Sequence, residues 1–179
     1  MTVQEDGVGD GPLARWRSAR IGGSMYSAVL CVAVLAVAGA VGLGLRQPWL
    51  FPSLGPTVML FFSAPAQPSS RPRNAIVGHT VGLVAGYGSF LALGLTGSRP
   101  APVAGLTPRY VVAAVVAVGV TTLVLHLLRL PHPPAGATTL IVALGILATP
   151  LALLDMFGAV VLITVLGWAL NRLLIGRVS

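Results

Sequence analysis

Four long apolar runs constrain the fold of this chain more than any other feature of its sequence. They cover residues 25–45, 75–95, 110–128 and 151–170. Each has close to the roughly 20 residues that a helix needs to cross a bilayer. Charged residues make up 8% of the 179-residue chain, against roughly 25% in a soluble domain. The sequence therefore predicts an all-α, polytopic membrane helical bundle, and it excludes a soluble enzyme, a disordered protein and a secreted disulfide scaffold.

The charges that are present are mostly arginine, and they lie between the apolar runs. The chain has eleven basic residues, all of them Arg, and four acidic residues, so its net charge is +7. Single Arg residues and small groups of them are typical of loops that orient membrane helices. A nucleic-acid partner, which would need a basic patch or stripe, is not expected. The single cysteine, Cys31, lies inside an apolar run and cannot form an intrachain disulfide.

Two shorter apolar segments, residues 48–62 and 131–144, each begin with proline. Because proline lacks an N–H and suits the first turn of a helix, each is predicted to be an irregular stretch followed by a helix of about 12–15 residues. Irregular backbone at membrane depth must be buried in protein or line a watery cavity. Both segments read Pro-x-x-Gly-x-Thr, and the matching residues, 81 positions apart, are Pro52, Gly55, Thr57 and Pro133, Gly136, Thr138.

The same offset relates the long runs. It aligns residues 25–45 with 106–126, and residues 75–95 with 156–176. The sequence thus predicts a two-fold internal repeat of long helix, proline-broken helix and long helix, with halves near residues 22–98 and 103–179. Three crossings in each half would make the repeat inverted, which is a recurring transporter design.

The distribution of Arg bears on how the short segments pass the membrane. With six crossings and a cytoplasmic N-terminus, eight Arg lie inside and three outside; if the short segments re-enter, the numbers are seven and four. The positive-inside rule favours six crossings by a small margin, so both topologies stay open. Residues 1–24 are predicted to be a cytoplasmic tail, with a cleaved signal peptide as the alternative. Residues 25–175 are predicted to be a multi-pass domain of the inner (plasma) membrane.

Three motifs in order along the chain resemble a known family. The His-Pro-Pro run at residues 132–134 resembles the signature of the HPP family of integral membrane proteins, and residues 51–57 and 71–79 resemble two further segments of that family. The resemblance spans residues 25–175. It implies four transmembrane helices, which matches the four long runs and leaves the short pair ambiguous. Some plant plastid and cyanobacterial members are associated with nitrite transport, so the resemblance makes nitrite a candidate ion.

The His-Pro-Pro turn is the leading candidate for a substrate-binding site. Pro133 and Pro134 keep the chain before the turn from being helical, so the following helix is expected to present unpaired N–H groups and a positive dipole end, which attract anions. Gly136 would let a ligand approach the backbone, Thr138 adds a hydroxyl, and His132 can titrate near neutral pH. The alternative is that the prolines only shape the start of a helix and His132 caps a carbonyl.

Pro52, Gly55 and Thr57 are predicted to form the symmetry mate of that turn and to supply a second helix N-terminus. The alternative is a structural kink. Asp155, the only acidic residue after position 10, is a candidate because an ionisable group inside a membrane span is usually functional. The alternative for Asp155 is a position close enough to the surface to be solvated.

Arg73, Asn74 and His79 lie at the start of the second long helix. Arg73 is placed to meet an anion at the cytoplasmic mouth, or it serves only to orient the helix and extends to the headgroups. Asn74 aligns with Asp155 in the repeat. The three histidines and Asp155 form no HExxH motif, so neither a bound metal nor a cofactor is expected.

Three glycines at four-residue spacing, Gly78, Gly82 and Gly86, indicate a face on which another helix packs closely. That helix belongs either to the same protomer or to a second copy in a homo-oligomer.

The function that these features favour is a small transporter or channel for a small inorganic anion, with nitrite as one candidate and the lipid bilayer as the surroundings. We expect no catalytic residues. The alternatives are a membrane-embedded enzyme that uses His and Asp, and a non-transporting membrane assembly subunit. An enzyme of that kind needs several convergent ionisable groups, and an assembly subunit has no need for two proline-broken segments at matching places.

Overall fold

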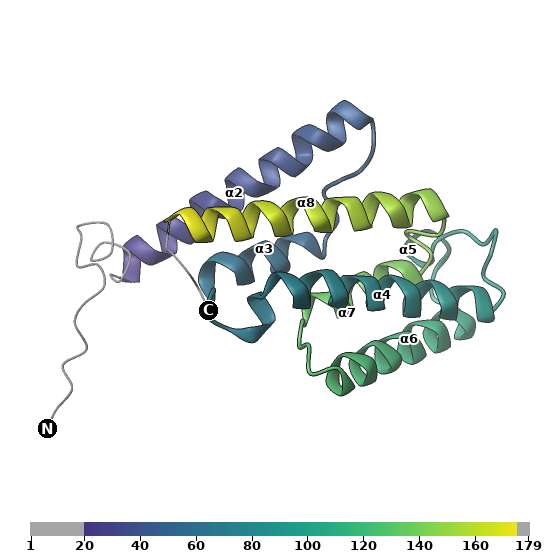
Figure 1. The fold of residues 1–179 in the computed structure, drawn as a ribbon. Coiled ribbons are helices and arrows are strands. Elements are labelled where there is room, and N and C mark those ends of the chain that lie inside the picture. Colours follow the sequence, from purple (N-terminus) through teal and green to yellow (C-terminus); the bar gives the residue numbers. More distant parts are fainter. Residues whose placement is uncertain (1–19, 175–179) are drawn as a thin grey trace, which may run out of the picture.

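The computed structural model describes residues 20–174, and all regular elements in that range are helical. The four long helices, shown in Figure 1, are α2 (Arg20–Leu45), α4 (Pro72–Ala92), α6 (Pro108–Leu127) and α8 (Pro150–Leu174). The short ones are α3 (Leu54–Ser63), η1 (Pro68–Ser70), α5 (Ala101–Ala104) and α7 (Pro134–Ala143). The four long helices are apolar enough and long enough to cross a membrane. The predicted all-α membrane bundle is confirmed.

Proline sets where most of these helices begin. Pro72, Pro108, Pro134 and Pro150 are each the first residue of a helix. Proline costs nothing at this position because its missing N–H would have had no partner inside the helix. The predicted boundaries shift accordingly, since α4 begins three residues before the apolar run that starts at position 75. Most of the predicted tail, residues 1–19, lies outside the described residues, and its last five residues form the start of α2.

Helices α2 and α6 end in the same way. Arg46 and Arg129 both have a positive φ, 55° and 53°. The next residue in each case donates its N–H to a carbonyl five positions earlier, Gln47 to Gly42 at 2.9 Å and Leu130 to Leu125 at 3.0 Å. This pairing satisfies carbonyls that a helix C-terminus otherwise leaves without partners. Equivalent ends on equivalent helices support the predicted internal repeat.

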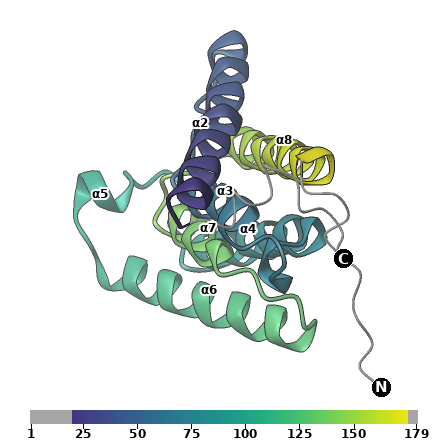
Figure 2. The same ribbon diagram turned by 90° about the vertical axis from the view of Figure 1, so that its left-hand side faces the viewer.

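The order long helix, short helix, long helix occurs twice, and the second copy is inverted. In Figure 1, α2 and α4 run in one direction along the bundle, whereas their counterparts α6 and α8 run in the other. The short helices α3 and α7 also point in opposite directions. The copies interlock, because α4 packs against α6 and α7 while α8 packs against α2 and α3. Figure 2 shows the same arrangement from one end, with α3, α4 and α7 between α2 and α6.

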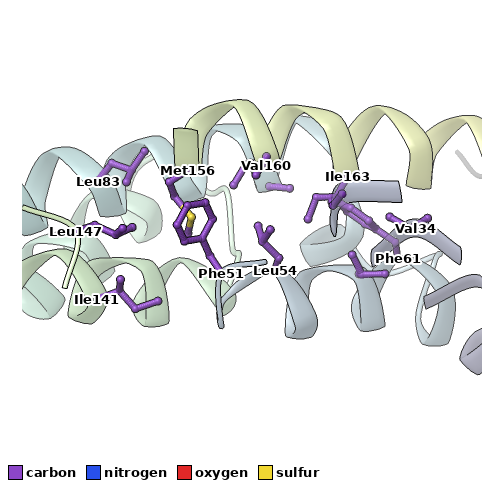
Figure 3. Close-up of a cluster of buried hydrophobic side chains, with 14 of the residues drawn as sticks. Val34, Phe51, Leu54, Phe61, Leu83, Ile141, Leu147, Met156, Val160 and Ile163 are labelled. Carbon is purple, nitrogen blue, oxygen red and sulfur yellow. The ribbon is translucent and has the colours of Figure 1, made fainter. Parts of the chain in front are cut away.

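The apolar core lies where α8 packs against α3 and α4. Figure 3 shows Phe51 and Leu54 under Met156 and Val160, and Phe61 beside Ile163. Large apolar side chains also cover the outside of the bundle, and examples that are more than half exposed are Val29, Val32, Val115, Leu123, Leu154 and Leu173. A soluble protein does not expose this much apolar surface, whereas lipid contact requires it.

Both short segments run between opposite ends of the bundle in Figure 1. The chain leaves α2 at one end, returns to the middle through residues 46–53, and continues through α3 to the other end. Residues 128–143 cross in the opposite direction. The described chain therefore passes through the bundle six times, which favours the six-crossing alternative. The end at which α2 begins carries Arg71, Arg73, Arg129 and Arg172, and the other end carries Arg46, Arg99 and Arg109.

Six crossings predict that single cysteines at Gln67 and Thr149, in a Cys31→Ser background, are labelled from opposite sides of the membrane. Both positions are exposed and lie between helices at opposite ends of the bundle. A membrane-impermeant maleimide applied to intact cells should label the cysteine at position 149, and the cysteine at position 67 only after permeabilisation. Labelling of both from the same side would instead support re-entrant segments.

Candidate functional site

A cluster of buried polar side chains lies where the first turns of α3 and α7 meet inside the bundle. Its members, referred to below as the central cluster, are Ser53, Thr57, His79, His132 and Thr138, and none is more than 2% exposed. Ser53 and Thr57 belong to the start of α3, and His132 and Thr138 to the start of α7. His79 comes from α4. Five hydrogen-bonding side chains are thus gathered in the interior of an apolar bundle.

His79 joins the two short helices. Its Nε2 atom lies 2.8 Å from Thr57 Oγ1, and its Nδ1 atom lies 2.7 Å from Thr138 Oγ1. The Thr138 hydroxyl donates to Ser53 Oγ at 2.9 Å, which links α7 to α3 directly. The Thr57 hydroxyl also lies 3.0 Å from the Ser53 carbonyl. These buried polar atoms thus lie within hydrogen-bonding distance of one another, as is usual for buried polar groups.

His132 completes the cluster from the other side. Its Nδ1 atom donates to the Ser69 carbonyl at 2.9 Å, because a carbonyl can only accept. Its Nε2 atom lies 3.2 Å from His79 Nε2 and 3.5 Å from Thr57 Oγ1. The two imidazole rings meet edge to face, with centroids 4.9 Å apart and planes inclined by 66°.

Three glycines of α4 allow this approach. A Cβ atom on Gly78 would lie 2.8 Å from His132 Cβ, one on Gly82 would lie 2.8 Å from the Ala135 carbonyl oxygen, and one on Gly86 would lie 2.8 Å from the Thr139 carbonyl oxygen. Since real Cβ atoms do not come so close, these positions accept only glycine in the present packing. The glycine face therefore packs against α7 within the protomer, which decides between the two alternatives that the sequence left open.

A cavity of about 440 Å³ lies beside the central cluster, between α6 and the start of α7. It reaches Gly136, where a Cβ atom would meet no other protein atom within 4 Å. Its lining is mostly apolar, and it comes from both helices and from the loop between them. The lining residues are Thr121, Thr122, Leu125, His126, Arg129, Pro131, His132, Pro133 and Gly136.

The prediction of unpaired N–H groups at the start of α7 is wrong for the first two N–H groups after Pro134. Ala135 donates to the His132 carbonyl and Gly136 to the Pro133 carbonyl, both at 3.0 Å. Pro133 already has right-handed helical angles, with φ −53° and ψ −35°, so the turn begins earlier than expected. The positive dipole end of α7 remains.

Asn74 and Asp155, which the repeat aligns, have matching structural roles and do not join the central cluster. Asn74 Nδ2 donates to the Pro131 carbonyl at 3.1 Å, and Asp155 Oδ1 accepts from Trp49 Nε1 at 3.2 Å. Each side chain thus fixes the stretch that leads into the short helix of the other half. The second carboxylate oxygen of Asp155 is buried without a hydrogen-bond partner within the described chain.

The remaining predicted site residues lie around the cluster. Pro52 and Pro133 are exposed, Pro134 is buried, and a Cβ atom on Gly55 would meet nothing within 4 Å, as at Gly136. Arg73 is exposed at the start of α4. Within residues 20–174, no group of three or more His, Cys, Asp or Glu side chains is arranged to hold a metal ion.

Sequence reasoning missed Ser53, the Ser69 carbonyl, His126 and Arg129. Ser53 stands directly before α3, where a hydroxyl residue is a common helix signal, and that signal was available. Nothing in the sequence indicates that the Ser69 carbonyl lies against His132, 63 positions away.

Replacement of Thr138 by valine, which has nearly the same shape, is predicted to destabilise the protein by about 1–3 kcal/mol. The change leaves His79 Nδ1 and Ser53 Oγ without their partner while it creates no cavity. The measurement is thermal unfolding in detergent, with Thr80→Val as the control. Thr80 makes only a local bond to the Ile76 carbonyl in the described structure, so equal melting temperatures for the two variants would contradict the importance of the cluster.

Comparison with known proteins places the sequence of this chain in a family. A family model described as "HPP, transmembrane region" matches residues 15–178. Two Dictyostelium discoideum proteins, each described as a transmembrane protein, are similar as well. One is 31% identical over 68% of this chain and 36% of its own length, and the other is 30% identical over 54% of this chain and 30% of its own length. The chain thus spans about a third of these relatives. No solved structure matches significantly.

Proposed function

The chain belongs to the HPP transmembrane family, and from this premise we propose that it is a transporter or channel for a small inorganic anion. Nitrite is the first ion to test, because some members of the family are associated with it. The chain is a multi-pass integral membrane protein, and we place it in the inner (plasma) membrane. The proposed role is conduction rather than catalysis.

The observation that carries the proposal is the meeting of two short helices, N-terminus to N-terminus, at the buried central cluster. Thr138 of α7 bonds Ser53 at the start of α3, so the two positive dipole ends lie together. Each such end stabilises a nearby anion by about 0.3–1 kcal/mol, and by up to about 2 kcal/mol in a partly buried site. In transporters built from inverted repeats, substrate sites lie at such breaks in membrane helices near the middle of the bilayer.

The cavity beside the central cluster supports the proposal because it offers an anion a route to the start of α7. Its lining is mostly apolar and includes the positively charged Arg129, and it reaches Gly136 on the first turn of α7. On the six-crossing topology, Arg129 lies at the Arg-rich end of the bundle, which the positive-inside rule assigns to the cytoplasm. An anion from that side would reach the helix N-termini through this cavity. In the described conformation, the hydrogen-bonded cluster would be the barrier beyond it.

Catalysis is less well supported. The carboxylate of Asp155 accepts a hydrogen bond from Trp49 and makes none with His79 or His132 in the described chain. A His and Asp mechanism requires the base to lie within hydrogen-bonding reach of the group that orients it. Of the two histidines, His132 lines the cavity, and we give it the role of a substrate contact.

Anion uptake into proteoliposomes tests the proposal. Purified protein is reconstituted into neutral lipid, and uptake of nitrite, nitrate and chloride is compared with that of protein-free vesicles from the same preparation. We expect uptake of at least one of the three anions to exceed the background about tenfold or more, with little binding at micromolar concentration, because a conducted ion must leave as well as enter. Uptake at the background rate for all three, with folded protein in the vesicles, would contradict the proposal.

A further inference from the structure

The two buried histidines form a single proton site. Ser69 contributes only a carbonyl oxygen, so the hydrogen in that 2.9 Å contact is on His132 Nδ1. A neutral imidazole carries one hydrogen, and His132 Nε2 is then a bare acceptor. This bare atom lies 3.2 Å from Nε2 of His79.

The tautomer of His79 is set by the hydroxyls around it. In the described geometry the Thr138 hydroxyl donates to Ser53 Oγ, so Thr138 Oγ1 accepts from His79 Nδ1. His79 Nε2 is then also bare, and two lone pairs face each other across 3.2 Å. The single proton of the Thr57 hydroxyl serves either one of these nitrogen atoms or the Ser53 carbonyl.

One additional proton relieves this conflict. Placed on either Nε2 atom, it converts the contact into an N–H···N hydrogen bond, with both Nδ1 donors kept in place. A second additional proton would set two N–H groups against each other at the same distance. Without any additional proton, two arrangements are open. Either the Thr57 hydroxyl donates to one Nε2 atom and the other has no donor, or the Thr138 hydroxyl turns to donate to His79 Nδ1, so that His79 Nε2 carries the hydrogen toward His132. The pair therefore holds one extra proton or none.

We propose that the central cluster takes up one proton together with each anion, so that the protein moves protons and anions across the membrane in a ratio of one to one. This inference rests on the proposed function and adds that anion movement is coupled to proton movement. An unpaired charge in a dry interior is very costly, whereas an imidazolium next to an anion at two helix N-termini is compensated. The proton is taken from water on one side and released to water on the other, and no bond changes except N–H.

The other ionisable groups that the structure describes near His79 and His132 take no part in the hydrogen bonds of the central cluster, so the two histidines set the number of protons bound. Helices α3 and α7 carry no ionisable side chain. From the α6 side, His126 and Arg129 line the adjacent cavity. On α4, Arg73 is exposed at the end of the bundle, and on α8, Asp155 bonds Trp49. Within the described residues, the hydrogen bonds of the cluster include none of these four groups.

The pH dependence of anion binding tests the inference without transport. Nitrite stays ionised between pH 6 and pH 8, so a coupled site should lose affinity for it by about tenfold for each unit of rising pH, because the linkage between proton and anion is reciprocal. Nitrite is titrated into the full chain in neutral-lipid nanodiscs, with ¹⁵N-labelled histidine as the readout. We expect nitrite, and not gluconate, to add one imidazolium proton in total to His79 and His132, with His126 identified from a His126→Gln sample.

Variants and flux complete the test. His79→Gln and His132→Gln should each bind nitrite with an affinity that no longer changes with pH, whereas Gly119→Val, on the outside of α6, should keep the wild-type slope. In vesicles, nitrate uptake should acidify the lumen at a clamped zero potential. Nitrite binding that is independent of pH, two imidazolium rings at once, or nitrate uptake without acidification would overturn the coupling and leave the proposed function standing. Absence of both binding and uptake would contradict both.

Discussion

Replacement of Gly136 by valine is expected to reduce anion flux by about five- to thirtyfold while the protein stays folded, since about 1–2 kcal/mol of dipole interaction is lost when the anion is kept away from the helix end. A Cβ atom at this position meets no protein atom within 4 Å, so the added methyl groups project into the cavity rather than into the core. The measurement is nitrite and nitrate uptake into proteoliposomes at matched protein content and melting temperature.

The control for this variant is Gly119→Val. Gly119 lies on the exposed side of α6, where an added Cβ atom also meets nothing within 4 Å. Both changes place a β-branched residue in a helix, so their effects on helix propensity are similar. Wild-type flux in the Gly136 variant, or an equal loss of flux in both variants, would show that the cavity beside α7 is not on the transport path.

Replacement of Gly82 by valine is expected to destabilise the protein by about 1–3 kcal/mol or more. The new Cβ atom would lie 2.8 Å from the Ala135 carbonyl oxygen and 2.9 Å from Thr139 Oγ1. Backbone cannot move aside as a flexible side chain does, so α4 and the start of α7 must separate. The expected consequence is a lower melting temperature together with loss of anion uptake.

Gly88→Val is the matched control, since Gly88 is on the same helix and a Cβ atom there meets nothing within 4 Å. Thermal unfolding of the two variants in the same detergent separates the cost of close packing from that of a β-branched residue in a helix. Similar melting temperatures would show that the approach of α7 to the glycine face of α4 contributes little to stability.

Much of the fold could be predicted because it depends on local patterns. Apolar runs of membrane length and prolines at helix starts identified the four long helices and the two short ones, and the 81-residue offset identified the repeat. The aligned pair Asn74 and Asp155 does occupy equivalent places in the two halves. Their roles could not be predicted, because the partners, the Pro131 carbonyl and Trp49, lie on segments more than 50 positions away.

The site could be predicted only in part. The candidates from the sequence include four members of the cluster, Thr57, His79, His132 and Thr138. They belong to three separate motifs, and nothing in the sequence indicates that they form hydrogen bonds with one another. Their meeting depends on the close packing of α4 on α7, which the glycine spacing suggested without naming the partner helix. The N–H groups of α7 were misjudged because Pro133 adopts helical angles, although it stands before another proline and that position usually disfavours them.

The position of a bound anion is the most direct test of these conclusions. Bromide resembles other small monovalent anions and is located in crystals by its anomalous scattering. In crystals of the protein grown with bromide, an anomalous peak is predicted in the cavity bounded by His132, Arg129 and Gly136, and nitrite should displace it. Bromide bound only elsewhere on the protein, or a peak in this cavity that nitrite leaves unchanged, would contradict an anion site beside the start of α7.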